Sequence, residues 1–169
     1  MIRSATSDDA AQICEIYNHY VLHTAVTFEE EAVRPEEMAR RIGEIVPKLP
    51  WLVWEEDGRV LGYCYAKPWR PRFAYRYSVE CTVYVYIDAC GRGIGSQLYR
   101  VLMSDLQERG FHTAIGGILV PNNASVALHE ALGFEKVAHF CQVGWKFGKW
   151  HDVGYWELIL GRAEETGQS

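Results

Sequence analysis

Three glycines at alternate positions, Gly91, Gly93 and Gly95, stand between a strand-like segment and a helix-like segment. Glycine adopts backbone conformations that other residues avoid, and its missing side chain lets the main chain approach a ligand closely. The helix expected after them begins near Ser96, where free N–H groups and the positive end of the helix dipole favour an anion. The segment therefore predicts a phosphate or pyrophosphate site; the alternative is a glycine-rich connection that binds nothing.

Two well-known nucleotide-binding patterns do not fit this segment. A dinucleotide fingerprint requires Gly-x-Gly-x-x-Gly, and here the third glycine comes one residue early, at Gly95. A P-loop requires Gly-x-x-x-x-Gly-Lys-Ser/Thr, which the sequence does not contain. Neither nucleotide-binding class is favoured.

Glu80 is a carboxylate inside a segment of apolar and aromatic residues. A carboxylate there costs free energy unless it is paired or faces a cleft. In a cleft it could act as a general base that takes the proton from an alkyl ammonium group, which is not nucleophilic while protonated. The alternatives are a solvent-facing residue or a structural ion pair.

Two arginines, Arg72 and Arg76, flank Tyr75 just upstream of Glu80. In a regular strand their even spacing would place both on one face, where guanidinium groups could bind a substrate carboxylate. A bend before residue 76, which Pro71 favours, would bring Arg72 closer to the substrate. Arg76 could be the nearer clamp, or it could instead pair with Glu80. The alternative is a pair of surface arginines that balance nearby acids.

The elements that must position these residues follow from hydrophobic periodicity and from turn signals. Helices are expected from Ser7 and from Pro35, and Asp57-Gly58 indicates a hairpin turn. The remaining expected elements are strands at 51–54, 60–66, 75–87, 113–120, 134–143 and 153–160, and helices at 96–109 and 124–132. With a first strand before the first helix, the order predicts an α/β or α+β fold with a mixed sheet.

Composition limits the class of protein. The chain has 169 residues and a net charge of −5, which indicates a single domain at 1–160 with a polar tail at 161–169 and argues against nucleic acid as the main partner. No apolar run is long enough for a membrane span, and the N-terminus does not read as a secretory signal. Five widely spaced cysteines without a Cys-x-x-Cys pair favour a reducing cytoplasm. No metal is expected, although His19 and His23 stand four residues apart.

The segment from Cys90 to Gly95 resembles the acetyl-CoA loop of the GNAT superfamily of N-acetyltransferases, Arg/Gln-x-x-Gly-x-Gly/Ala, with Cys90 departing from the first position. Within that superfamily the chain is similar to the phosphinothricin and methionine sulfoximine N-acetyltransferases over about residues 2 to 160. The segments that carry this similarity are 27–29, 50–53, 62–63, Trp69, 74–76, 79–80, 83–85, 121–122, 127–134, 146–150 and Asp152.

The resemblance implies a mixed sheet splayed at its centre, with acetyl-CoA as co-substrate in the split. It places the general base at Glu80 and a histidine, His129, near the CoA sulfur, where a group that titrates near neutrality could protonate the leaving thiolate. The alternative for His129 is a packing or capping residue. The acetyl-CoA-binding positions implied are Val83, Tyr84, Val85, Gly91, Arg92, Gly93, Ile94, Gly95, Ser96 and Asn122.

Three of these assignments carry further expectations. The backbone of residues 83–85 is expected to pair with the pantetheine arm, with a bulge that aims an N–H at the thioester carbonyl. Arg92 is expected to compensate for the side chain that Cys90 lacks. Asn122 is expected to contact pantetheine, or else to serve as a turn or helix N-cap residue.

On the amine side, the resemblance adds Phe28, on the loop between the first two helices, to Arg72, Tyr75 and Arg76. It implies a homodimer and, as acceptor, the primary amine of a small amino-acid-like molecule. Because no cysteine is placed to carry an acyl group, direct transfer of acetyl in a ternary complex is expected. The rivals are a polyamine, aminoglycoside or protein amine as acceptor, or an acetyl-CoA-binding module without catalysis. Lys146, Lys149 and Trp150 indicate a structural hairpin.

Overall fold

The computed structural model describes residues 1–161, and the polar tail predicted at 161–169 lies outside them from residue 162 on. The strands are β1 (Ile2–Ser4), β2 (Trp51–Glu56), β3 (Arg59–Pro68), β4 (Ser78–Val85), β5 (Thr113–Val120), β6 (Glu135–Lys146) and β7 (Lys149–Ile159). The α-helices are α1 (Ala10–His23), α2 (Pro35–Ile45), α3 (Ile94–Glu108) and α4 (Asn123–Ala131). Short 3-10 helices lie at Ser7–Asp9, Phe73–Tyr75 and Ile87–Ala89.

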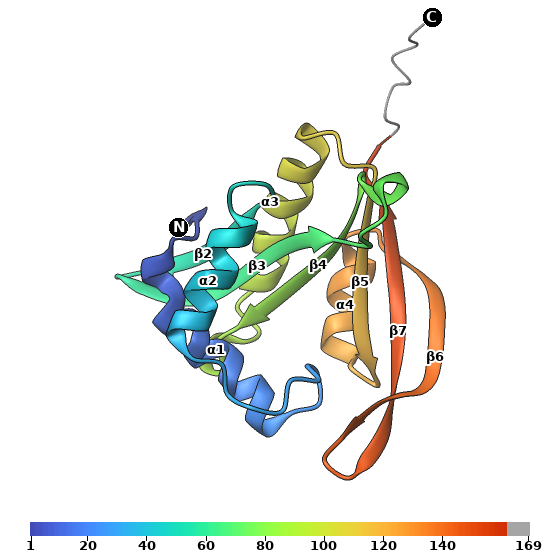
Figure 1. The fold of residues 1–169 in the computed structure, drawn as a ribbon, viewed down its shortest axis with the longest axis horizontal. Coiled ribbons are helices and arrows are strands. Elements are labelled where there is room, and N and C mark those ends of the chain that lie inside the picture. Colours follow the sequence, from blue (N-terminus) through green and yellow to red (C-terminus); the bar gives the residue numbers. More distant parts are fainter. Residues whose placement is uncertain (162–169) are drawn as a thin grey trace, which may run out of the picture.

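The seven strands form one mixed sheet in the order β1-β2-β3-β4-β5-β7-β6. All neighbours are antiparallel except β4 and β5, which are parallel and joined through α3. The predicted α/β architecture with a mixed sheet is therefore confirmed (Figure 1). No helix within residues 1–161 has both the length and the apolar character that a membrane span requires.

The sheet is split at its centre. Strands β4 and β5 pair over three positions, from Ser78 opposite Thr113 to Glu80 opposite Ile115, although β4 continues to Val85 and β5 to Val120. Beyond Glu80 the two strands diverge, which leaves a gap between them along the rest of β4 (Figure 1). The splay expected from the family resemblance is present, and Glu80 is the last paired residue before it.

Separate cores cover the two faces of the sheet. Helices α1 and α2 bury Ile13, Val21 and Ile42 against one face, and α3 buries Leu98 and Leu102 against the other. Because side chains alternate along a strand, Tyr84 of β4 packs on the first core, whereas Val83 and Val85 pack on the second. Residues that project into the gap can therefore reach two chemically different surroundings.

Some predicted strands differ in extent from those in the structure. The strand expected at 75–87 is shorter, because residues 73–75 form a 3-10 helix whose turn is closed by the Tyr75 N–H donating to the Arg72 carbonyl, at 2.9 Å. The last two strands are longer than predicted and meet at a tight turn with positive φ at Phe147 and Gly148. This turn confirms the hairpin indicated by Lys146 and Lys149.

Candidate functional site

The backbone of β4 lines one side of the central gap. The Tyr86 N–H donates to the Leu61 carbonyl of β3, at 2.8 Å, so the even-numbered residues of β4 direct their backbone groups to β3. Val83 and Val85 consequently direct theirs into the gap, where the Val85 carbonyl accepts from the Tyr20 hydroxyl at 2.6 Å. These are the backbone groups that an extended ligand in the gap can pair with.

The expected β-bulge is not found in β4. The register between β3 and β4 is continuous from Gly62 opposite Val85 to Pro68 opposite Val79. An oxyanion donor on this strand would have to come from a regular strand that loses its partner, and such a strand leaves its outward N–H groups free without a bulge.

The glycine loop closes the far end of the gap. Gly91 and Gly93 have φ of +80° and +78°, a backbone conformation that favours glycine, and Gly93 is the N-cap of α3. A Cβ at Gly95 would stand 3.0 Å from the Leu128 side chain and 3.5 Å from that of Val85. The N-terminus of a 15-residue helix thus lies against the end of β4. This arrangement supports the predicted anion site.

Arg92 and Cys90, the polar side chains of the loop, are both exposed. Arg92 forms a bidentate ion pair with Glu56 of β2, with the shorter N–O distance 2.7 Å, and this pairing lowers the pKa of Glu56. The predicted contact between Arg92 and a pyrophosphate would therefore compete with Glu56.

Glu80 lies where the sheet opens and is one-quarter exposed. Its Oε2 pairs with the Lys67 ammonium at 3.0 Å, and Lys67 stands directly opposite it on β3. Its Oε1 lies 3.5 Å from where a Cβ on Gly117 would stand, so it points toward β5 across the mouth of the gap. Glu80 is thus both an ion-pair member and a carboxylate with one oxygen directed at the candidate site.

His129 lies on the face of the sheet that α3 covers, where it is 3% exposed. Its ring is in edge-to-face contact with Tyr99 and Phe134. Its Nδ1 donates to the Ser125 carbonyl at 2.8 Å, because a carbonyl can only accept. Its Nε2 is buried without a hydrogen-bond partner among residues 1–161, and burial lowers the pKa of the ring. The neutral ring therefore carries a lone pair, not a proton, at Nε2, and the predicted acid role would require a change of protonation there.

Asn122 is the N-cap of α4. Its Oδ1 accepts from the Ser125 N–H at 3.1 Å, which is the capping role considered as the alternative at this position. The predicted pantetheine contact is not tested by this arrangement.

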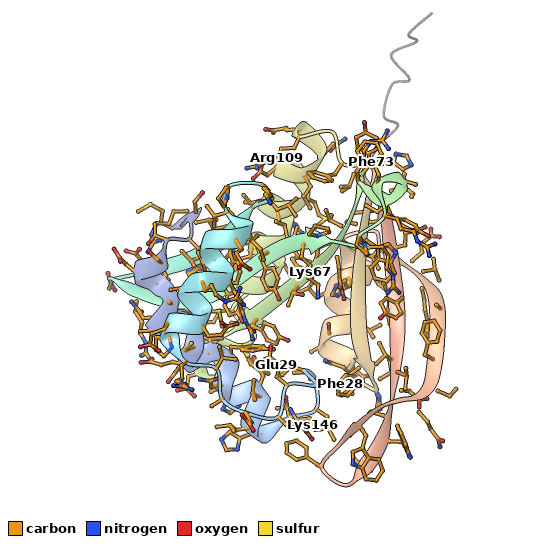
Figure 2. The ribbon with its side chains drawn as sticks, in the orientation of Figure 1. Phe28, Glu29, Lys67, Phe73, Arg109 and Lys146 are labelled. Atoms are coloured by element: carbon orange, nitrogen blue, oxygen red, sulfur yellow. The ribbon has the colours of Figure 1, made fainter. Side chains whose placement is uncertain are left out.

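The residues predicted for the amine side lie on two segments, the 3-10 turn with its caps at 72–76 and the loop that carries Phe28. Arg72 and Arg76 flank a 3-10 helix and do not share a strand face, so that prediction is wrong. Arg76 donates to the Phe73 carbonyl and lies over the Phe73 and Tyr77 rings, 4.3 and 4.4 Å from the centroids, and it does not pair with Glu80. Figure 2 shows Phe73 and Phe28 on opposite sides of Lys67.

Phe28 belongs to a loop that is held by a buried lysine. Lys146 is 1% exposed. Its ammonium donates to the carbonyls of Val21, Thr27 and Glu29, at 2.6, 2.8 and 2.8 Å. Burial lowers the pKa of this amine. The Phe28 ring covers Gly144 so closely that a Cβ there would overlap it. The loop between α1 and α2 is thus fixed to the β6–β7 hairpin (Figure 2).

Sequence reasoning missed Lys67 and Tyr155, although Trp69 was expected as a possible wall of the amine pocket. Trp69 and Tyr155 stack edge to face with ring centroids 5.5 Å apart, and a Cβ at Gly117 would stand 3.2 Å from the Tyr155 ring. The usable signal was the alternation along β3, because Tyr63, Tyr65 and Lys67 share a face and the last of them is the first charge on it.

A group of side chains of metal-ligand types lies on the β6–β7 hairpin, where Asp152 stands opposite Val120 at the end of β5. Donor atoms of His139, Cys141 and Asp152 lie within 4.8 Å of one another, where β6 is irregular. Asp152 already accepts from the His139 Nε2 and from the Gln142 N–H, both at 2.8 Å, and this bonding lowers its pKa. The Lys136 ammonium, 3.1 Å from the His139 Nδ1, adds a positive charge that opposes a bound cation.

The fold of this chain, with its split sheet, is matched by known proteins. The model of the GNAT acetyltransferase domain matches residues 2–154. The chain belongs to this family.

Relatives of this GNAT protein include enzymes that act on amino-acid analogues. A phosphinothricin N-acetyltransferase of Streptomyces viridochromogenes is 42% identical over 92% of this chain and 85% of its own. A methionine sulfoximine and methionine sulfone acetyltransferase of Salmonella typhimurium is 40% identical over 94% of each chain. A phosphinothricin acetyltransferase from Sinorhizobium meliloti, solved with acetyl-CoA, has a TM-score of 0.93 at 36% identity and covers 100% of this chain, which covers 92% of it.

The family defines the reaction class for this GNAT protein. It is an acetyl-CoA-dependent N-acetyltransferase, with acetyl-CoA as co-substrate. The gap beside β4 and the helix N-terminus at Gly93 fit such a co-substrate, since one offers an extended backbone edge and the other an anion site.

Proposed function

We propose that this enzyme transfers acetyl directly to the primary amine of a small amino-acid-like acceptor of the kind that phosphinothricin and methionine sulfoximine represent. The observation that carries the proposal is Glu80, a carboxylate at the position where β4 and β5 separate, with Oε1 directed across the gap. A base at that position meets an amine that approaches the thioester from the face covered by α1 and α2. The domain responsible is residues 1–160.

The reaction follows from the groups at the gap. Glu80 Oε1 accepts a proton from the acceptor ammonium, and the freed nitrogen attacks the thioester carbonyl carbon. A backbone N–H of Val83 or Val85, directed into the gap, stabilises the developing oxyanion. The C–N bond forms, the C–S bond breaks and CoA leaves as a thiolate. The second proton of the attacking nitrogen is lost as the amide forms, and it passes to the thiolate or to solvent. We propose a ternary complex, without an acetyl-enzyme, because no exposed cysteine lies beside Glu80 to carry the acetyl group. The exposed cysteines are Cys90 and Cys141, and neither is next to Glu80 in the sheet.

His129 is the second residue that we assign to the reaction, with the smaller share. A thiolate with a pKa of about 8.5 leaves readily and needs little help from an acid. With Nδ1 held by Ser125, the buried Nε2 is the atom through which this ring would exchange a proton with the sulfur.

The remaining residues support the same site. We assign the pyrophosphate to the backbone of residues 91–96 and the pantetheine arm to residues 83–85 and Asn122. We also assign Phe28, Arg72 and Tyr75 to the rim of the amine site, and Arg76 to the shape of the 3-10 turn. An acceptor rich in positive charge, such as a polyamine or aminoglycoside, would instead call for acids around Glu80, where the structure has Lys67.

We further propose a homodimer in the cytoplasm. Apolar side chains more than half exposed cluster on the outer hairpin, at Val137, Phe140, Val143, Trp145, Phe147 and Trp150, and β6 is the edge strand of the sheet. All five cysteines are free, which suits a reducing compartment. Sedimentation at micromolar concentration should give a dimer, and a fully active monomer would overturn the assembly.

The acceptor is tested by measuring acetyl-CoA-dependent thiol release. We expect turnover with phosphinothricin, methionine sulfoximine or related amino acids, and little with spermidine or an aminoglycoside. Glu80→Gln should lower kcat by about 10²- to 10⁴-fold and leave the Kd for acetyl-CoA unchanged. Near-normal turnover at pH 7 in that variant would remove Glu80 as the base. Acetyl-CoA binding without thiol release for any amine would favour a non-catalytic module.

A further inference from the structure

The pairing of Lys67 with Glu80 is unusual for a group that must accept a proton. The two residues face each other across β3 and β4, with the Lys67 Nζ 3.0 Å from the Glu80 Oε2. Glu80 has no other ion-pair partner within residues 1–161. Neither Arg72 nor Arg76 pairs with Glu80, so the positive charge next to this carboxylate is that of Lys67.

Lys67 is available to a ligand and stays charged. Its side chain is 45% exposed, whereas that of Glu80 is 24% exposed, so a small molecule can reach the ammonium from solvent. Partial burial lowers the pKa of Lys67, but the facing Glu80 carboxylate and nearby Tyr65 and Tyr155 raise it more, and the net shift is upward. At neutral pH the residue is therefore a cation.

The surroundings suit a compact ligand. Trp69 and Tyr155 form an aromatic corner beside Lys67, and Gly117 leaves open the space between Tyr155 and the Glu80 Oε1. The ammonium and carboxylate of an α-amino acid are attached to the same carbon atom, so they form a dipole of about the same size as the Lys67–Glu80 pair. When such a molecule lies antiparallel to that pair, its carboxylate is next to the Lys67 ammonium and its ammonium is next to the Glu80 carboxylate.

We propose that Lys67 binds the acidic group of the acceptor, which displaces the Glu80 Oε2 from the ammonium and selects zwitterionic α-amino acids and their analogues as substrates. The inference rests on the proposed function and names the residue that determines its substrate class. When the acceptor carboxylate takes the place of Glu80 on Lys67, Glu80 turns to the acceptor ammonium, whose proton it receives. An amine without an acidic group leaves the Lys67–Glu80 pair intact, so Glu80, the base, stays bound to the Lys67 ammonium.

The test compares Lys67→Met, which keeps the apolar stem, with Lys67→Arg, which keeps the charge. Lys48→Met, an exposed lysine on the loop after α2, is the matched control. For an α-amino acid that the wild type acetylates, Lys67→Met should raise KM about 10- to 100-fold, the range expected when a charge-assisted hydrogen bond is lost. The corresponding amine without the carboxylate should change less than about threefold, and the KM for acetyl-CoA should not change.

A binding measurement separates recognition of the acceptor from turnover. Calorimetric titration of the same amino acid into the enzyme–CoA complex should show the same loss of affinity in Lys67→Met without any turnover. Lys67→Arg should recover most of that affinity.

The outcomes distinguish this inference from the proposed function. If wild type acetylates α-amino acids and Lys67→Met weakens acceptors with and without a carboxylate equally, the inference is wrong and the proposed function stands. If wild type acetylates no α-amino acid but does acetylate amines that lack an acidic group, the proposed function fails and the inference fails with it.

Discussion

Replacing Lys146 by Met removes a buried ammonium but keeps its apolar stem, so the change isolates three hydrogen bonds. The carbonyls of Val21, Thr27 and Glu29 lie 2.6 to 2.8 Å from the Nζ and would lose their shared donor. A buried carbonyl left unpaired costs about 1–3 kcal/mol, whereas relief from burying a charge returns part of that cost. We expect a net loss of about 3 kcal/mol in the free energy of unfolding.

This loss should be visible in a melting experiment and in the kinetics of the amine. For a chain of this length, about 3 kcal/mol corresponds to a fall in Tm of roughly 6–12 °C by circular dichroism. The three carbonyls belong to the end of α1 and the loop after it, which also carries Phe28. The KM for the amine should therefore rise more than the KM for acetyl-CoA, measured well below the new Tm.

Lys149→Met is the control, because Lys149 is exposed and stands opposite Lys146 at the same hairpin turn. It should melt within about 1 °C of wild type, as surface substitutions usually do. If Lys146→Met melts like the control, the three carbonyls do not depend on the ammonium. If its Tm falls but both KM values rise equally, the lysine supports the fold without shaping the amine site.

Two other substitutions test residues assigned to the acetyl-CoA side of the site, Gly93 by its effect on binding and His129 by its effect on stability. Gly93→Val forces a β-branched residue into a φ of +78° at the N-cap of α3, so acetyl-CoA should bind more weakly by calorimetry, and unchanged affinity would remove the phosphate cradle from this loop. Burial lowers the pKa of His129 below its usual 6.5, so below that pH the unfolded chain takes up a proton that the folded chain does not, and stability should fall as the pH drops from about 6.5. His129→Gln should flatten that part of the stability curve in denaturant titrations at pH 5 to 8, and an unchanged slope would show that the ring titrates normally in the folded protein.

Local chemistry made much of the fold predictable. Pro35 begins α2, Asp57 and Gly58 form the β2–β3 turn with positive φ, and Gly91 and Gly93 adopt the conformations that their residue type favours. Each of these signals depends on a few adjacent residues. The splay between β4 and β5, in contrast, was expected from the family resemblance and not from periodicity.

Predictions failed where the answer depended on strand register. A segment rich in Tyr and Val predicted a strand from residue 75, but pairing with β5 begins at Ser78, so the shared face assigned to Arg72 and Arg76 does not exist. Lys67 escaped notice for the same reason. It is 13 residues from Glu80 in the chain and opposite it in the sheet, and only the β3–β4 pairing reveals the contact.

Two consecutive glycines on β5, Gly116 and Gly117, leave room for the side chains of His129 and Glu80 to approach this strand closely. A Cβ on Gly116 would overlap the His129 ring, and one on Gly117 would stand 3.5 Å from Glu80. Neighbouring positions on a strand point to opposite faces, so the strand separates the imidazole from the carboxylate. Glycine in a strand interior weakens it, and here the missing side chains leave room for a close approach on each side. A proton that Glu80 receives from the amine therefore has no direct route to His129, and the two groups must exchange protons with different atoms of the reacting pair.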